Sequence, residues 1–272
     1  MGEWDATTYD GKATILRVVR EEAEKFIALA SDPQAWDRET SCNRWTTRDV
    51  VGHIVDTTEG YFTAFDAARS HTDPAAPFGL AAMSQVAGDR ALGFRDVPQA
   101  ELMERLSTDL DKCMEMLDGV GADEWSTLTV VHPYMGSVPA FFYAAGQLMD
   151  YAVHSWDLRE GSGRAHAMSG DAADLLVPFM LVLWQSTIRE DADTSPFQIG
   201  IRVSGGHNAG AWRVSISPEG MSYEPASVDD LPCVLEFDAA GLVLTTFGRC
   251  NTGTVRGDGA IADRFLNLFF RI

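Results

Sequence analysis

The sequence changes character at Gly161–Gly163, a short Gly-Ser-Gly run. Before this run, apolar residues recur at the three- and four-residue spacing of one helix face. Gly and Pro interrupt this pattern between long stretches, and Gly-Ser-Gly ends the last of them. We therefore expect four long helices, over residues 11–31, 46–70, 98–118 and 137–160. Helices of this kind predict an antiparallel bundle, which buries their apolar stripes against one another.

After Gly163 the pattern is that of a mixed α+β domain. Residues 170–190 predict one more helix, and the runs FQIGIRVS, AWRVSIS, MSYEP and CVLEFD have the composition of short strands. The segments DAAGLVLTTFGR and GAIADRFLNLFF return to helical spacing. We therefore predict two domains, a helical bundle of residues 1–162 and a small α+β domain of residues 163–272.

Charge and cysteine usage exclude several classes of function. The chain has 272 residues and a formal net charge of −19, which argues against a nucleic-acid partner and against an anionic membrane surface. We see no secretion signal and no apolar run of about 18 residues, so we expect a cytoplasmic protein without a membrane span. The cysteines lie far apart, without the spacing of a disulfide framework or a cysteine-based zinc site.

Two of the predicted helices carry side chains that suit a metal site. Asp150 and His154 are four residues apart, so they project from the same face of the last helix of the bundle. His53 lies on an apolar stripe of the second helix, which Thr46 and Asp49 are placed to start as a capping box. Bundles build metal sites from facing helices, and two imidazoles with one carboxylate form a common ligand set of catalytic sites.

Spacing alone leaves simpler interpretations open. A histidine on an apolar stripe, such as His53, is often a satisfied core residue. A carboxylate and an imidazole four residues apart, such as Asp150 and His154, are often a surface hydrogen bond. The sequence does not show whether the second helix and the last helix of the bundle face each other.

Both helices resemble a known family. The segments RWTTRDVVGHIVDTTEGYF and LMDYAVHSWDLREGSG are similar to the paired signature of the DinB-like metal-binding bundle, and more specifically of the mycothiol-dependent maleylpyruvate isomerase family. Its members carry W-x-x-R-D-x-x-x-H at a helix start and carboxylate-x-x-x-H-x-W-D-L in the fourth helix. The C-terminal half, ending in FGRCNTGTVRGDGAIADRFLNLFF, resembles the sterol-carrier-like α+β domain of that family.

The resemblance implies a set of site residues. His53, Asp150 and His154 would bind a divalent metal, for which zinc suits the ligand types. The best-known enzyme of the family has Glu where this chain has Asp150, whose carboxylate reaches about 1.5 Å less far. Arg249 would reach toward the bundle's site and hold a substrate carboxylate, a role that a bidentate guanidinium suits. Equally, Arg249 could be an arginine near a helix C-terminus, where the helix dipole favours a positive charge.

Three further side chains have a functional and a structural interpretation. Arg48 could take part in the site or pair with an acidic surface group. Asp157 could accept a hydrogen bond from an imidazole N–H or could solvate the end of its helix. His132, in TVVHPYMGS, could approach the site from a loop, although His-Pro is usually an extended turn.

The function implied by the resemblance is thiol-dependent metal catalysis. Mycothiol would be the cosubstrate, and its thiolate would add to a small, electrophilic, anionic substrate to give an isomer or an adduct. Thiol S-transfer or S-conjugate exchange on a specialised metabolite is a second possibility. A non-catalytic metal-binding module, with a C-terminal domain that binds an apolar ligand or a partner, is a third. We expect a monomer or a homodimer.

Overall fold

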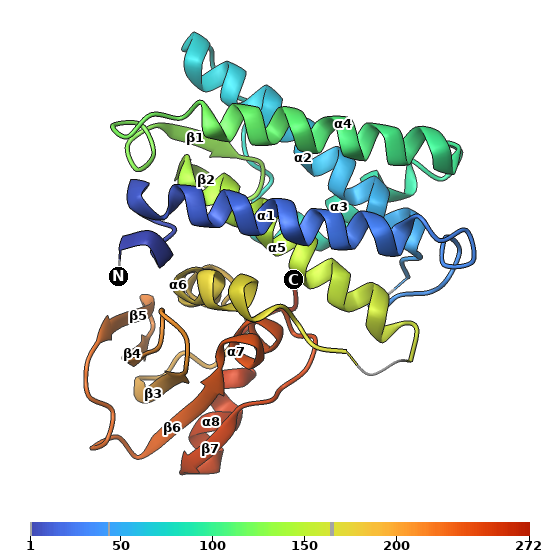
Figure 1. Cartoon of the computed structure of the whole chain (residues 1–272). Helices are drawn as coiled ribbons and strands as arrows, with labels where there is room; N and C mark the ends of the chain where they lie inside the picture. Colours follow the sequence, from blue (N-terminus) through green and yellow to red (C-terminus); the bar gives the residue numbers. More distant parts are fainter. Residues whose placement is uncertain (1, 43, 164–165) are drawn as a thin grey trace. The chain divides into compact units, whose positions relative to one another are not determined.

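The structure is a computed structural model that describes residues 2–42, 44–163 and 166–272. It divides into two compact units, Met1–Ala172 and Ala173–Ile272 (Figure 1). The first unit is helical and the second contains the larger β-sheet. The predicted fold class, a helical domain followed by a small α+β domain, is therefore confirmed.

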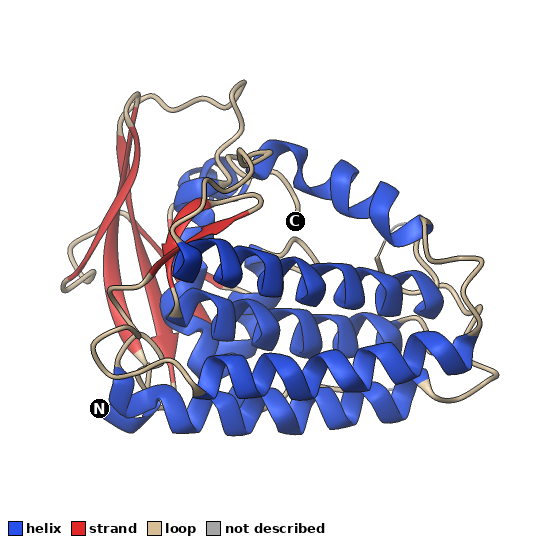
Figure 2. Cartoon of the chain, turned by 90° about the horizontal axis from the view of Figure 1, so that it is seen from above, coloured by secondary structure: helices blue, strands red, loops and turns tan. Residues whose placement is uncertain are grey.

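Four long helices lie side by side in the N-terminal unit (Figures 1 and 2). They are α1 (Tyr9–Ala30), α2 (Thr47–Ser70), α4 (Gln99–Asp118) and α5 (Phe141–Glu160). Their apolar stripes pack together, and the stripe of α1 that contains Val18 and Phe26 is fully buried. Helix α5 is buried on nearly every side, as expected of a helix with apolar residues all around its surface.

Shorter elements complete this unit. The 3₁₀ turn η1 (Gly2–Trp4) precedes α1, and η2 (Leu80–Ala82) leads into helix α3 (Met83–Leu92), which packs against α2. Helix α3 was not predicted from the sequence. Only Ala87 and Ala91 of this helix are buried, so it has no stripe of large apolar residues to reveal it.

The predicted start of the last helix at residue 137 is wrong. Residues 136–139 form strand β2 (Gly136–Pro139), which pairs antiparallel with β1 (Thr129–His132). The pairing aligns Val130 with Val138 and buries both side chains. This cross-strand contact outweighs the helical tendency of the segment, and α5 begins after it.

The C-terminal unit contains a five-stranded mixed sheet in the order β5-β4-β3-β6-β7. Strands β3 and β6 are parallel and the other neighbours are antiparallel. The strands are β3 (Phe197–Ser204), β4 (Gly210–Ser217), β5 (Gly220–Pro225), β6 (Cys233–Asp238) and β7 (Thr254–Gly257). Four of them were predicted. Strand β7 was not, because all four of its residues are exposed on the sheet edge and show no alternation.

Three helices belong to this sheet unit: α6 (Gly170–Ser186), α7 (Ala239–Thr246) and α8 (Gly259–Leu266). Helices α7 and α8 both contact β3 and β6. Trp184 of α6 is buried between the rings of Phe265 and Phe269, at centroid distances of 5.2 and 5.6 Å. These rings join the helices into one core.

The helices of the described residues include none that is long and apolar enough to cross a bilayer.

Candidate metal centre

The start of α2 fixes the position of His53. The backbone N–H of Thr46 donates to the Asp49 carboxylate at 2.9 Å, which confirms the predicted capping box. Arg95, from the loop after α3, adds two hydrogen bonds of 2.8 Å to the same carboxylate. Burial tends to raise the pKa of Asp49, but the bonds from Arg95 and Thr46 outweigh it and lower that pKa. His53 lies one turn after Asp49, so these hydrogen bonds fix the position of its backbone.

The three predicted metal ligands lie together between α2 and α5. His53 Nε2 is 3.6 Å from Asp150 Oδ1, and the rings of His53 and His154 are 5.2 Å apart in an edge-to-face arrangement. One nitrogen or oxygen atom from each side chain lies within 4.8 Å of the others. Ligands bonded to one zinc ion are roughly 3.3–3.5 Å apart, from bond lengths of 2.0–2.2 Å. Small side-chain movements would close this set around an ion.

Although the Asp150 side chain is one methylene shorter than glutamate, it still belongs to the cluster. Its carboxylate contacts the His53 ring across the gap between the helices. Both side chains are half-buried, whereas His154 is buried. The donor types, two imidazole nitrogens and one carboxylate oxygen, suit a zinc-type ion with a remaining position for a small ligand.

Asp157 orients the imidazole of His154 through its Nδ1 atom. Its Nδ1 lies 2.9 Å from Asp157 Oδ2, one helical turn along α5. Because a carboxylate can only accept, Nδ1 carries the proton and Nε2 keeps its lone pair for a metal. Burial lowers the pKa of His154, although Asp157 opposes this effect, and the neutral imidazole is the form that binds metals.

Asp157 is itself held by the loop before α2. Ser41 Oγ donates to Asp157 Oδ1 at 2.5 Å, and Cys42 Sγ donates to Oδ2 at 2.9 Å. Neither Ser41 nor Cys42 was predicted from the sequence to support the site. No spacing rule connects them with α5, because 115 positions separate Cys42 from Asp157.

Cys42, His154 and Asp157 form a second group with metal-binding atom types. Cys42 Sγ lies 3.6 Å from His154 Nδ1, and both groups contact the same carboxylate oxygen. These atoms already satisfy one another as donors and acceptor. We therefore interpret the group as the hydrogen-bonded support of His154.

An aromatic ring lies against both histidines of the cluster. The indole of Trp45 is 5.0 Å from the ring of His53 and 6.0 Å from that of His154. Further along α2, the ring of Tyr61 is 6.1 Å from that of His132 and 4.6 Å from that of Tyr143. Low exposure to water strengthens the electrostatic interactions of such polar groups.

His132, which the sequence placed in a loop, is the last residue of β1. Its Nδ1 accepts the backbone N–H groups of Tyr134 and Met135, both at 3.2 Å. Burial lowers its pKa to about 4, against the opposing charge of Asp150. His132 is therefore a neutral ring with its proton on Nε2, within electrostatic range of the cluster.

Other candidate residues have structural partners. Arg48 binds Asp37 at 2.7 Å, in agreement with pairing to an acidic surface group. Arg249 lies after α7 in the C-terminal unit, where its Nη1 donates to backbone oxygen atoms of Phe247 and Ile272.

The sequence of the helical unit matches a known family. Residues 16–159 match the description "Mycothiol maleylpyruvate isomerase N-terminal domain". The chain belongs to this family. The match contains His53, Asp150, His154 and Asp157, so the whole cluster of the α2–α5 interface lies within the family domain.

The fold of the whole chain is also found among solved structures. Two of them, the mycothiol-dependent maleylpyruvate isomerase and a histidine-to-alanine mutant of it, align with 90% of this chain and 92% of their own. The TM-score is 0.59 and the sequence identity is 14% in both cases. At this identity the likeness establishes the two-part fold. No curated protein sequence matches the chain.

Proposed function

We propose that this protein is a divalent-metal-dependent enzyme that uses a low-molecular-weight thiol, mycothiol, to isomerise a small, electrophilic, anionic substrate. The observation that supports this most is the convergence of His53, Asp150 and His154 between two helices of the matched family domain. The matched family and the structural neighbours are named after mycothiol and maleylpyruvate. Addition or transfer of the thiol to the substrate is the chemical variant of the same proposal.

Each residue of the cluster has a distinct role in this proposal. His53, Asp150 and His154 hold the ion, for which we propose zinc, and leave one position for an outside ligand. When bound, the ion supplies positive charge that lowers the pKa of a thiol, so that thiolate is present at neutral pH. Asp157 keeps the His154 imidazole in the tautomer that presents Nε2. The ring of Trp45 shields the histidines from bulk water.

The chemistry needs a carbon–carbon double bond conjugated with a carbonyl group in the substrate. The thiolate adds to one carbon of this bond and forms a carbon–sulfur bond, while the electron pair of the double bond moves onto the carbonyl oxygen as an enolate. The remaining single bond can rotate, and return of the electron pair expels the thiolate and restores the double bond in the other geometry. If the enolate takes up a proton and the adduct is released instead, the enzyme is a transferase.

The two parts of the chain take different tasks in the proposal. We assign the metal to a domain of residues 1–162 and the binding of the substrate's carboxylate to a domain of residues 163–272, through Arg249. A guanidinium binds a carboxylate through two parallel hydrogen bonds. Arg249 Nη1 donates to backbone oxygen atoms of Phe247 and Ile272, and these bonds orient its guanidinium.

Metal analysis tests the first step. Protein purified without chelators should contain roughly one divalent ion per chain, as expected for a site with three protein ligands. His154→Ala and His53→Ala should lose the ion, whereas His207→Ala, at an exposed turn of the C-terminal unit, should retain it. Equal metal content in all four proteins would show that the cluster is not the metal site.

Thiol binding and turnover test the later steps. Mycothiol should raise the melting temperature of the metal-loaded protein, because a ligand of the native state stabilises it, and S-methylated mycothiol should not. Mycothiol-dependent conversion of maleylpyruvate would establish the isomerase, and accumulation of an S-conjugate would establish the transferase. If the protein binds metal but responds to no thiol, the non-catalytic module becomes the better interpretation.

A further inference from the structure

The imidazole of His132 has one hydrogen-bond donor whose direction is fixed and which the protein itself does not use. Its Nδ1 accepts hydrogen bonds from the backbone N–H groups of Tyr134 and Met135, so the single proton of the neutral ring is on Nε2. Among the described residues no group accepts a hydrogen bond from Nε2–H, and this nitrogen is not fully buried. A bound molecule can therefore accept this hydrogen bond.

The hydroxyl group of Tyr61 is a second donor beside His132. The two rings are 6.1 Å apart, and strand β1 packs against α2 at this point. The Tyr61 Oη lies directly on the backbone of α5, because a Cβ added at Gly146 would be 2.5 Å from this oxygen. Within the described part of the chain the hydroxyl makes no hydrogen bond. Two unused donors thus lie side by side between the hairpin and the bundle.

Both donors lie close to the candidate metal ligands. Gly146, which Tyr61 Oη touches, precedes Asp150 by four residues on α5, a rise of about 6 Å along the helix. The charge of Asp150 acts on Tyr61 and on His132 alike. A substrate whose reacting carbon lies at the metal ligands can therefore place an oxygen atom a few bonds away at these two donors.

Tyr61 and His132 are both neutral near pH 7. Burial raises the pKa of the Tyr61 hydroxyl well above its usual range, and the charge of Asp150 adds to this effect. Burial lowers the pKa of His132 to about 4, although Asp150 opposes the shift. A phenol and a neutral imidazole suit the binding of an oxygen atom on which negative charge develops, because both donate a hydrogen bond without losing the proton.

We infer that His132 Nε2–H and the Tyr61 hydroxyl bind the carbonyl oxygen of the unsaturated substrate and stabilise its enolate. The inference rests on the proposed function and adds two catalytic residues to it. As the thiolate sulfur forms its bond to the β-carbon, the electron pair of the double bond moves through the conjugated system onto this oxygen. The two hydrogen bonds become stronger as the charge develops. When the electron pair returns, the carbon–sulfur bond breaks and the thiolate leaves.

Steady-state kinetics of the full-length, metal-loaded protein with mycothiol and maleylpyruvate test the inference. His132→Asn keeps an acceptor for the turn, but its shorter amide does not reach the position of Nε2. We expect His132→Asn and Tyr61→Phe each to lower kcat by about 10²- to 10³-fold, the usual effect of losing one such donor, with little change in KM. His132→Gln, whose amide N–H reaches the position of Nε2, should lose less. Metal content should be unchanged in all three variants.

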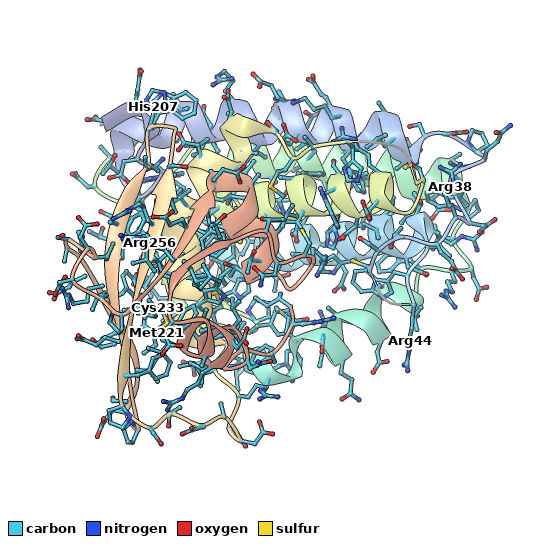
Figure 3. The ribbon with its side chains drawn as sticks, turned by 90° about the horizontal axis from the view of Figure 1, so that it is seen from below. Arg38, Arg44, His207, Met221, Cys233 and Arg256 are labelled. Atoms are coloured by element: carbon cyan, nitrogen blue, oxygen red, sulfur yellow. The ribbon has the colours of Figure 1, made fainter. Side chains whose placement is uncertain are left out.

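Matched controls carry the same substitutions at exposed positions. His71→Asn lies at the left-handed C-cap of α2, a conformation that asparagine tolerates, and Tyr9→Phe lies at the start of α1. His207→Asn, at a turn of the C-terminal unit (Figure 3), is a further histidine control. All three should have the wild-type kcat, and melting temperatures verify that every variant is folded.

Infrared spectroscopy measures the same contacts without turnover. The probe is trans-4-oxopent-2-enoate, a carboxylate with a ketone conjugated to a double bond, which is not converted when no thiol is present. Binding to the metal-loaded wild type should lower the frequency of its ketone C=O stretch, because hydrogen bonds polarise this group. The shift should be smaller in His132→Asn and in Tyr61→Phe and unchanged in His71→Asn. A purely structural role of the two residues would not change this frequency.

Three results would overturn the inference: wild-type kcat in His132→Asn, an equal loss of kcat in His71→Asn, or the same C=O frequency in the wild type and in both donor variants. Failure of the proposed function has a different signature, namely a wild-type protein without mycothiol-dependent turnover. The infrared measurement needs no thiol, so it decides in that case too whether the two donors bind a carbonyl oxygen.

Discussion

Asp157 Oδ2 lies 2.9 Å from His154 Nδ1, on the side of the imidazole away from Nε2, the nitrogen that we propose binds the metal. Because the same carboxylate also accepts from Ser41 and Cys42, its position is fixed from three directions. The pair has the arrangement of a carboxylate that supports a metal-binding histidine, which raises the basicity of the ring and fixes its tautomer.

Asp157→Asn should therefore weaken metal binding by about 10- to 100-fold, the usual cost of losing such a partner. The asparagine amide can present an N–H to Nδ1 and so favour the wrong tautomer. Competition with a chromogenic chelator measures the affinity. Asp123→Asn, at an exposed position of the same unit, is the matched control and should behave as the wild type. An unchanged metal affinity in Asp157→Asn would mean that the hydrogen bond from His154 to Asp157 does not contribute to metal binding.

The charge of the Asp150 carboxylate should matter more for the affinity for a divalent ion than the length of the side chain does. Asp150→Asn removes the charge and leaves the size unchanged, so it should lower the affinity for a divalent ion more strongly than Asp150→Glu, which lengthens the arm by one methylene. The same chelator competition compares the two variants. If Asn binds the ion as well as Asp does, then Asp150 is not a ligand and its contact with His53 has no role in metal binding.

The sequence predicted those parts of the fold that have a regular period. The apolar stripes of α1 and α4 identified the bundle, and the four-residue spacing of Asp150 and His154 placed both on one face of α5. The capping box of α2 was also visible, because its two residues are neighbours in the chain. In each case the pattern and the structure depend on the same local geometry.

The remaining features depend on contacts between distant residues. Neither the support of Asp157 by Ser41 nor the binding of Asp49 by Arg95 leaves a periodic signal. The β1–β2 hairpin replaced the first turn of the expected helix because Val130 and Val138 bury each other across the strands.

The Asp49–Arg95 pair should stabilise the start of α2. Asp49→Asn loses the charge-assisted hydrogen bonds to Arg95 and weakens the capping box, and we expect a loss of about 1–3 kcal/mol in the free energy of unfolding. Urea denaturation at pH 7 measures it. Because the pKa of Asp49 is lowered in the folded protein, this contribution is present above its ordinary pKa of 3.8 and is lost as the pH falls below it. Equal stability of variant and wild type at pH 7 would contradict the assignment.

His132 should make the protein less stable in mild acid. Burial lowers its pKa from 6.5 to about 4, so between these values the unfolded chain binds a proton that the folded protein does not. The free energy of unfolding should therefore decrease as the pH falls from 6.5 toward 4, because the number of bound protons is larger in the unfolded state.

His132→Asn isolates this effect. The asparagine Oδ1 can replace Nδ1 as acceptor for the backbone N–H groups of Tyr134 and Met135, so the turn is retained while the titrating group is removed. Denaturation of both proteins at pH 7 and pH 5 should show a larger decrease in the wild type. Parallel decreases would mean that His132 keeps its ordinary pKa and is not enclosed by the aromatic rings of Tyr61 and Tyr143.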